Sequence, residues 1–302
     1  MMEVAKKFFD LGTEIVVAVR REEDLPGAVL VVKELAKQVD FAASRFKRDS
    51  ELGFIMRDGK THGMSPLLKE LIYSAVWAEE VTDGLVDPTV GASLEALGYD
   101  RDFSKIVAMS PRATKPCIPP GRDGFEVDFK RGTLRIKNGV IIDLGATGKA
   151  KLSDLAAEKV LKSGVKGVLV SCGGDIALAG EAPESGWAIR MSEDCTLNQG
   201  PIISLFDGGL ATSSTTVRKW KSGKDINNHL VNPKTGGTVN GPWRTISVAA
   251  EDCLAANTAS TAAMVLGSKA VAWLEERKLP ARLVAQSGEV TLMGAWPEGT
   301  EK

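Results

Sequence analysis

Histidine and cysteine are scarce in this chain of 302 residues, which has two histidines and four cysteines. The cysteines, at positions 117, 172, 195 and 253, are far apart, and no two of them form a C-x-x-C pair. Zinc centres and disulfide frameworks need cysteine or histidine ligands at short, regular spacings. The composition therefore argues against both kinds of site.

An excess of charge of one sign is also missing, because 38 Lys and Arg residues balance 39 Asp and Glu residues to a formal net charge of −1. A surface that binds nucleic acid or anionic lipid needs a basic excess or a basic cluster. No apolar run reaches the roughly 18 residues of a membrane-spanning helix, and the first residues lack the apolar core of a signal peptide. We therefore expect a cytoplasmic protein with no transmembrane segment and no nucleic-acid partner.

The hydrophobic residues, 43% of the chain, instead follow the patterns of short strands and amphipathic helices. Proline and glycine mark a loop at 111–121, and the polar residues 44–52 predict another. Helices are predicted at 26–41, 66–81, 152–160 and 253–266, with a further one ending near 277. Strands are predicted at 13–19, 125–129, 134–136, 140–144, 167–171, 176–179, 187–191, 202–206, 245–250, 283–285 and 290–293. Because strands outnumber helices and come in adjacent groups, the pattern favours an α+β fold with mixed or antiparallel sheets.

The first candidate for chemistry is the segment Asp143 to Lys149, which reads D-L-G-A-T-G-K. A glycine turn that enters a helix exposes backbone N–H groups to a phosphate, and Lys149 adds a positive charge. A Walker A loop would need glycine at position 143 and Ser or Thr at position 150, where the chain has Asp143 and Ala150. A P-loop NTPase is therefore excluded, while a connection that binds no ligand is an equal alternative for this segment alone.

A second candidate is the run Cys172-Gly173-Gly174-Asp175, which follows an apolar strand. Paired glycines let a backbone approach a ligand, and the Asp175 carboxylate can accept a hydrogen bond from a sugar or ring. The same residues also form ordinary hairpin turns. Neither histidine lies near Cys172 in the sequence, so we interpret Cys172 as a small buried residue and not as a nucleophile.

The other two candidates lie in the second half of the chain. The hydroxyl cluster at 212–216 precedes His229, whose side chain suits proton transfer near neutral pH, although a surface histidine would look the same. Asn257 and Thr261 are four residues apart on a predicted helix, so their oxygens can reach one hard cation. Polar residues on the solvent side of that helix are the alternative. No G-x-S-x-G sequence is present to indicate a hydrolase of that type.

Taken together and in order, these segments resemble the ApbE family, the flavin transferases that move FMN from FAD onto a protein hydroxyl. Residues 82–91 are similar to the motif T-x-G-x-F-D-P-T-V-G, residues 143–154 to D-L-G-[GA]-x-A-K-G-x-x-x-D, and residues 229–236 to H-x-[IV]-[DN]-P-x-T-G. Shorter family motifs fall at 12–13, 50–52, 173–175, 212–214 and 256–262. The chain departs from the residues usual in the family at Ala150 and Lys151 (usually Gly-Tyr), Ser214 (Gly), Asn232 (usually Asp) and Asn257 (Asp).

The resemblance implies an ApbE-like bilobal α+β fold over residues 1–302, a single domain with mixed or antiparallel sheets flanked by helices and a flavin cleft between the lobes. It implies FAD as substrate, Mg²⁺ as metal, and an acceptor protein whose Ser or Thr receives FMN while AMP leaves. The implied catalytic residues are His229, Lys149 and Thr261, and the implied metal ligands are Ala146, Asn257 and Thr261. The implied cofactor contacts are Gly145, Thr147, Lys149, Asp154, Gly173, Gly174, Asp175, Ser213 and His229.

Asn257 stands where the family has an aspartate that ligates the divalent metal. An amide oxygen can bind Mg²⁺, but the loss of a unit charge predicts a weaker site. Two alternatives therefore stay open. One is a non-catalytic protein that binds FAD or FMN, and the other is a metal-dependent FAD pyrophosphatase in which water replaces the acceptor hydroxyl.

Overall fold

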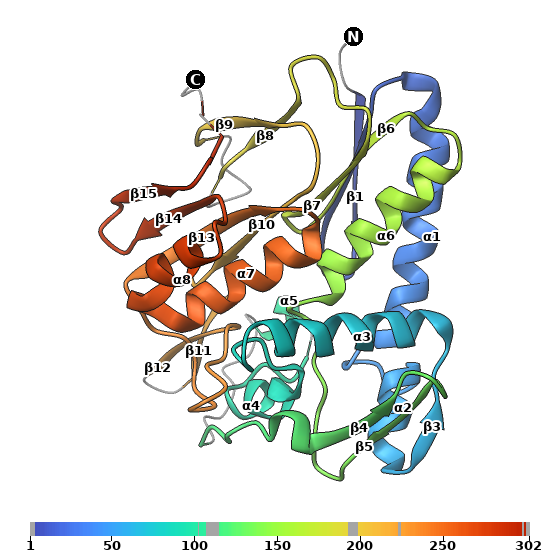
Figure 1. The fold of residues 1–302 in the computed structure, drawn as a ribbon. Helices are drawn as coiled ribbons and strands as arrows, with labels where there is room; N and C mark the ends of the chain where they lie inside the picture. The colour runs from blue at the N-terminus through green and yellow to red at the C-terminus, as the bar shows by residue number, and fades with distance from the viewer. Residues whose placement is uncertain are drawn as a thin grey trace. The chain divides into compact units, whose positions relative to one another are not determined.

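The computed structural model describes residues 4–101, 103–106, 115–192, 199–222, 225–297 and 299. Cys195 and residues 111–114 of the predicted loop lie outside this part of the chain. The chain forms two compact units (Figure 1). Unit 1 comprises Met1–Ala36, Lys149–Val217 and Gly241–Lys302, and unit 2 comprises Lys37–Gly148 and Arg218–Asn240. That they form a single domain stays a prediction.

Unit 1 is built on a sheet that has eight strands within the described residues, in the order β1-β2-β6-β7-β10-β13-β14-β15. Every neighbouring pair in it is antiparallel. The strands are β1 (Val4–Asp10), β2 (Thr13–Val19), β6 (Gly167–Cys172), β7 (Asp175–Gly180), β10 (Gly209–Ser214), β13 (Trp243–Ala250), β14 (Ala281–Ala285) and β15 (Val290–Met293). The sequence-based expectation of antiparallel sheets is thus met in this unit.

Alternation along the strands divides the two faces of this sheet. On one face, side chains such as Ile176, Leu178 and Leu210 pack into an apolar cluster with Trp187 and Ile203. Trp187 and Ile203 belong to a separate antiparallel pair, β8 (Trp187–Arg190) and β9 (Ile202–Leu205). The other face of the sheet receives helix α7 (Cys253–Leu266), which packs against β7, β10 and β13.

Helix α7 is rich in alanine and almost wholly buried, because its small side chains let the helix lie close to the sheet. Asp252 caps its first turn by accepting a hydrogen bond from the Ala255 N–H at 2.7 Å. The other helices of this unit are α6 (Gly148–Lys162), α8 (Ala270–Glu276), the first part of α1 (Leu25–Ala43), and the short 3₁₀ turns η1 (Glu22–Asp24) and η4 (Gly267–Lys269). Among the described residues, no helix is long and apolar enough to cross a membrane.

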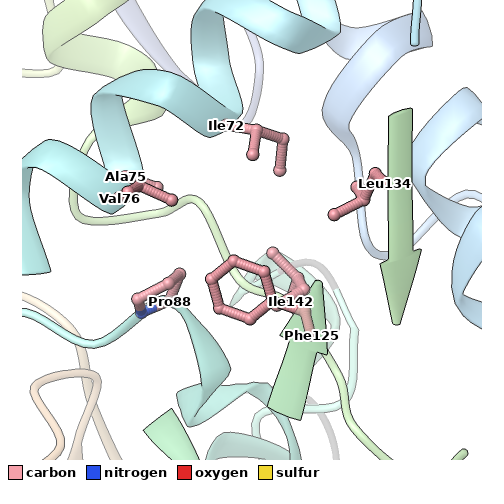
Figure 2. A pocket seen from close by; sticks show the side chains of 7 residues that line it. All are labelled: Ile72, Ala75, Val76, Pro88, Phe125, Leu134 and Ile142. Carbon is pink, nitrogen blue, oxygen red and sulfur yellow. The ribbon is translucent and has the colours of Figure 1, made fainter. Parts of the chain in front are cut away.

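Unit 2 combines short helices with two small antiparallel sheets, β3-β5-β4 and β11-β12. Its core contains a small pocket whose lining is entirely apolar and buried, so it is part of the packing and not a polar binding site. Figure 2 shows the lining side chains of Ile72, Ala75, Val76, Pro88, Phe125, Leu134 and Ile142. The elements are α2 (Glu51–Asp58), β3 (Thr61–Gly63), α3 (Pro66–Val81), η2 (Pro88–Val90), α4 (Gly91–Ala96), α5 (Phe103–Ile106), η3 (Gly121–Gly124), β4 (Phe125–Asp128), β5 (Thr133–Ile136), β11 (Lys219–Ser222) and β12 (Asp225–Asn228).

Two local predictions are wrong in this unit. Residues 140–144 do not form a strand, because the Ile141 carbonyl accepts from the Gly91 N–H at 3.1 Å and the Asp143 N–H donates to the Pro88 carbonyl at 2.8 Å. The predicted loop 44–52 ends in the start of helix α2, which Ser50 caps by accepting from the Gly53 N–H at 2.9 Å. The strands β1, β3, β10, β11 and β12 were not predicted.

Candidate functional site

Four polar side chains form a buried cluster between the sheet and helix α7 in unit 1, and we call it the oxygen cluster. Asp175 and Ser213 belong to the sheet, and Asn257 and Thr261 belong to the helix. The Asn257 Nδ2 donates to Asp175 Oδ1 at 2.7 Å, and the Thr261 Oγ1 donates to Asn257 Oδ1 at 3.3 Å. Ser213 Oγ lies 3.1 Å from Thr261 Oγ1 and 2.9 Å from Ser260 Oγ. Each of the four residues is at most 8% exposed. The alternative that Asn257 and Thr261 face solvent is therefore wrong.

The periodicities of strand and helix place these side chains together. On β7, Ile176 and Leu178 point into the apolar cluster, so Asp175 points to the opposite face, where α7 lies. On β10, Leu210 points into the apolar cluster, and Ser213 reaches the helix from the other face. Asn257 and Thr261 then face the sheet from successive turns of α7.

Oxygen atoms of amide and hydroxyl groups dominate the chemistry of this cluster. Among the residues that the structure describes, no group of three or more His, Cys, Asp or Glu side chains could hold a metal ion. Asp175 is the one carboxylate in the oxygen cluster, and the Lys149 Nζ lies 3.8 Å from its Oδ2. Amide, hydroxyl and carboxylate oxygens are hard donors of the kind that Mg²⁺ accepts. The cluster therefore fits a hard divalent cation in donor type, with little negative charge.

Asp154 on α6 holds the start of α7. Its Oδ1 accepts from the Cys253 N–H at 2.9 Å and its Oδ2 accepts from the Leu254 N–H at 3.0 Å. A carboxylate at a helix N-terminus satisfies N–H groups that have no partner inside the helix. Burial nevertheless raises the pKa of Asp154 to about 6, since a charged carboxylate loses its hydration there. The structure shows Asp154 positioning the helix of the oxygen cluster, and its contact with a cofactor stays a prediction.

The turn between β6 and β7 uses two glycines with positive φ, +67° at Gly173 and +94° at Gly174. A side chain at Gly173 would approach Thr13 Oγ1 to 2.5 Å, whereas the space beside Gly174 is open. Both glycines are therefore explained by the turn, and a ligand contact there stays a prediction. Burial raises the pKa of the adjacent Cys172 thiol to about 12, which is consistent with its interpretation as a structural residue.

The predicted phosphate turn belongs to unit 2. The Gly145 N–H donates to Asp143 Oδ1 at 2.7 Å, and the Thr147 and Gly148 N–H groups donate to the Leu144 carbonyl at 3.1 and 2.6 Å. Gly145 is exposed, Ala146 is half-buried and Thr147 is buried. The chain then enters unit 1 between Gly148 and Lys149, in the first turn of α6. The roles expected for Gly145, Ala146 and Thr147 stay predictions.

His229 also lies in unit 2, directly after β12, and is half-buried. Its neighbour Asn228 fixes the backbone, because the Leu230 N–H donates to Asn228 Oδ1 at 3.0 Å and Asn228 Nδ2 donates to the Val239 carbonyl at 2.9 Å. A bridge between Val231 and Thr238 closes the following loop. Hydrogen bonds therefore fix the backbone on both sides of His229. Its part in proton transfer stays a prediction.

Sequence reasoning did not find the pairing of Asp175 with Asn257 or the helix-capping role of Asp154. No local signal could have shown the first, because the two residues are 82 positions apart in the chain. For the role of Asp154 there was only a partial signal. Asp252 indicates that a helix begins at Cys253, since an aspartate just before an apolar helix is typical of an N-cap, but it does not point to Asp154.

An antiparallel sheet covered by a small-residue helix, with oxygen donors buried between them, defines an α+β protein. The ApbE family model matches residues 11–283, and the chain belongs to this family.

Curated relatives carry one common name. A Haemophilus influenzae FAD:protein FMN transferase is 24% identical over 268 residues, which cover 85% of this chain and 78% of that protein. A Salmonella typhimurium protein of the same name is 25% identical over 264 residues, 83% of this chain and 74% of its own length. A Rhodobacter capsulatus protein of that name is 24% identical over 220 residues, and the match covers 72% of this chain but 42% of the relative.

Solved structures show the same fold. The ApbE protein from Thermotoga maritima matches with a TM-score of 0.84 and 23% identity, over 97% of each chain. The flavin transferase ApbE from Vibrio cholerae matches with a TM-score of 0.75 and 18% identity, also over 97% of each chain. The predicted ApbE-like α+β fold is confirmed, and the flavin cleft stays a prediction.

Proposed function

We propose that this chain transfers FMN from FAD to a Ser or Thr hydroxyl of an acceptor protein and releases AMP. In this reaction the acceptor oxygen forms a bond to the FMN phosphorus, the bond between the two phosphates breaks, and the hydroxyl proton leaves to a base. Family membership and the names of the curated relatives support the flavin transfer. The observation that carries the proposal is the oxygen cluster, which collects hard donors on a buried face of unit 1.

The proposal includes a divalent cation, Mg²⁺, because the reacting phosphates are highly charged. Bound Mg²⁺ would supply positive charge against the phosphoryl oxygens in the transition state. Within the oxygen cluster, Asn257 and Thr261 would hold the ion through Oδ1 and Oγ1, as the family resemblance implies. Ala146, the third implied ligand, belongs to unit 2, and its part is also a proposal.

The other roles follow from charge and position. Lys149 lies in the first turn of α6, beside Asp175, and would neutralise charge on the transferring phosphoryl group. His229 would accept the proton of the attacking hydroxyl near neutral pH. Asp154 would act on the reaction only indirectly, by fixing the first turn of the helix that carries Asn257 and Thr261.

The test is incubation of the purified protein with FAD and Mg²⁺, with and without acceptor polypeptides that contain Ser or Thr. AMP in the supernatant, together with an acceptor whose mass rises by one FMN, is the expected result. AMP and free FMN without any need for acceptor would indicate a pyrophosphatase instead. Bound but intact FAD across all acceptors would indicate a flavin-binding protein and would refute the transferase.

A further inference from the structure

We propose that Asp175 is a positioning residue of the cation site. Its carboxylate orients the Asn257 amide and makes the amide oxygen more negative, which partly replaces the charge that Asn257 itself lacks. The inference rests on the proposed function for the identity of the cation. It concerns metal binding by the free protein, however, so it can be tested without FAD and without an acceptor.

The contact with Asp175 orients the Asn257 amide. The Asn257 Nδ2 donates to Asp175 Oδ1 at 2.7 Å, and the Lys149 Nζ lies 3.8 Å from the other oxygen of this carboxyl group, which suits an acceptor at both oxygens. The amide oxygen is then left on the side of Thr261, whose hydroxyl lies 3.3 Å away. Asp175 thereby presents the Asn257 oxygen and the Thr261 oxygen together, as a pair of ligands for one cation.

The same hydrogen bond also affects the strength of the ligand. A hydrogen bond to a charged acceptor is stronger than a neutral one, and it polarises the amide so that its oxygen becomes more negative. Asp175 and Asn257 are 4% and 7% exposed, so water screens this effect little. Histidine ligands of zinc are strengthened in the same way by a carboxylate that accepts their second N–H.

The pairing also explains why an acid and an amide can share this place. Two carboxylates at the separation of Asp175 and Asn257 would repel each other unless a proton or a cation lay between them. With one acid and one amide, the pair is stable in the absence of metal. The arrangement predicts that the acid and the amide can be exchanged between positions 175 and 257 without loss of the hydrogen bond.

The experiment measures the affinity of the protein for Mn²⁺, an oxygen-seeking substitute for Mg²⁺, by electron paramagnetic resonance without flavin. Asp175→Asn should weaken binding roughly 10- to 100-fold, the usual effect of losing a carboxylate that supports a metal ligand. The double variant Asp175→Asn/Asn257→Asp should restore or exceed wild-type affinity, because the carboxylate then binds the ion directly. Thr212→Val is the matched control, since Thr212 lies on β10 beside Ser213 but its 2.8 Å hydrogen bond goes to Ser247 on β13, outside the oxygen cluster.

Circular dichroism and thermal melts establish that each variant is folded before its affinity is compared. The inference is overturned if folded Asp175→Asn binds Mn²⁺ as the wild type does, if the double variant gives no recovery, or if the wild type shows no binding at millimolar Mn²⁺. The flavin assay is judged separately. Transfer of FMN by a protein that binds no metal would refute the inference and the proposed metal dependence but would leave the transferase standing. Mn²⁺ binding without AMP release would refute the transferase alone.

Discussion

Asp154 offers a sensitive test of how the site is built, because its half-buried carboxylate caps the helix that carries Asn257 and Thr261. Its pKa is raised from an ordinary value of 3.8 to about 6, so the folded protein binds its proton more tightly than the unfolded chain does. The contribution of Asp154 to the free energy of unfolding must then fall as the pH rises from about 4 to about 6, and it stays level above that. The perturbation is Asp154→Asn, which keeps the shape of the side chain and removes the titration.

The size of this effect on the free energy of unfolding follows from the pKa shift of Asp154. From the two pKa values, the ionisation of Asp154 costs about 3 kcal/mol above pH 6, of which about 2 kcal/mol develops between pH 4.5 and 7.5. We expect the difference in melting temperature between wild type and Asp154→Asn to shift by roughly 4–8 °C in favour of the variant over that range. Differential scanning calorimetry at both pH values measures it, and the other titrating groups cancel in the comparison.

The comparison also separates two effects of the substitution. The amide that Asp154→Asn introduces would keep one acceptor for α7 but would turn its NH₂ toward the second N–H, which gives a penalty that does not depend on pH. The part of the difference in melting temperature that is the same at both pH values therefore measures the lost helix cap. The part that changes with pH measures the ionisation of the Asp154 carboxyl group. A difference between the two proteins that stays the same from pH 4.5 to 7.5 would refute the argument that burial sets this pKa.

Helix limits were predicted well from the sequence where the signals are local. Helix α3 begins at Pro66 after the cap Ser65, and α7 spans Cys253–Leu266 as expected, because capping and helical spacing act over a few residues. The segment 140–144 has the apolar composition of a strand, but its backbone bonds to Pro88 and Gly91, a tertiary arrangement that its own sequence does not encode.

Strand β10 was not predicted because the residues that face the oxygen cluster are not typical of a strand. Strand β10 reads G-L-A-T-S-S, and its face toward α7 carries small and hydroxyl side chains where a strand usually shows bulky apolar ones. The pairing of Asn257 with Thr261 could be predicted because helical spacing is local. The contact of Asn257 with Asp175 could not, because it depends on the strand order β7-β10-β13 and on the placement of α7 against those strands.

Three further changes test the oxygen cluster, the buried thiol and the core of unit 2. Thr261→Val removes a hydroxyl that bonds two members of the cluster while conserving volume, so we expect a folded protein whose rate of AMP release falls about 10-fold or more; an unchanged rate would exclude Thr261 as a ligand. A thiol reagent at pH 8 should modify the exposed Cys117 in the native protein and leave Cys172 intact until urea is added, because burial holds the pKa of Cys172 near 12; mass spectrometry of the peptides decides it. Phe125→Ala would enlarge the apolar pocket of Figure 2, and since Phe125 is 6% exposed we expect a loss of about 3–5 kcal/mol in the free energy of unfolding, with a smaller loss for Phe125→Leu. Equal urea midpoints for these two variants would show that the pocket collapses around any smaller side chain, so that no cavity remains to destabilise the unit.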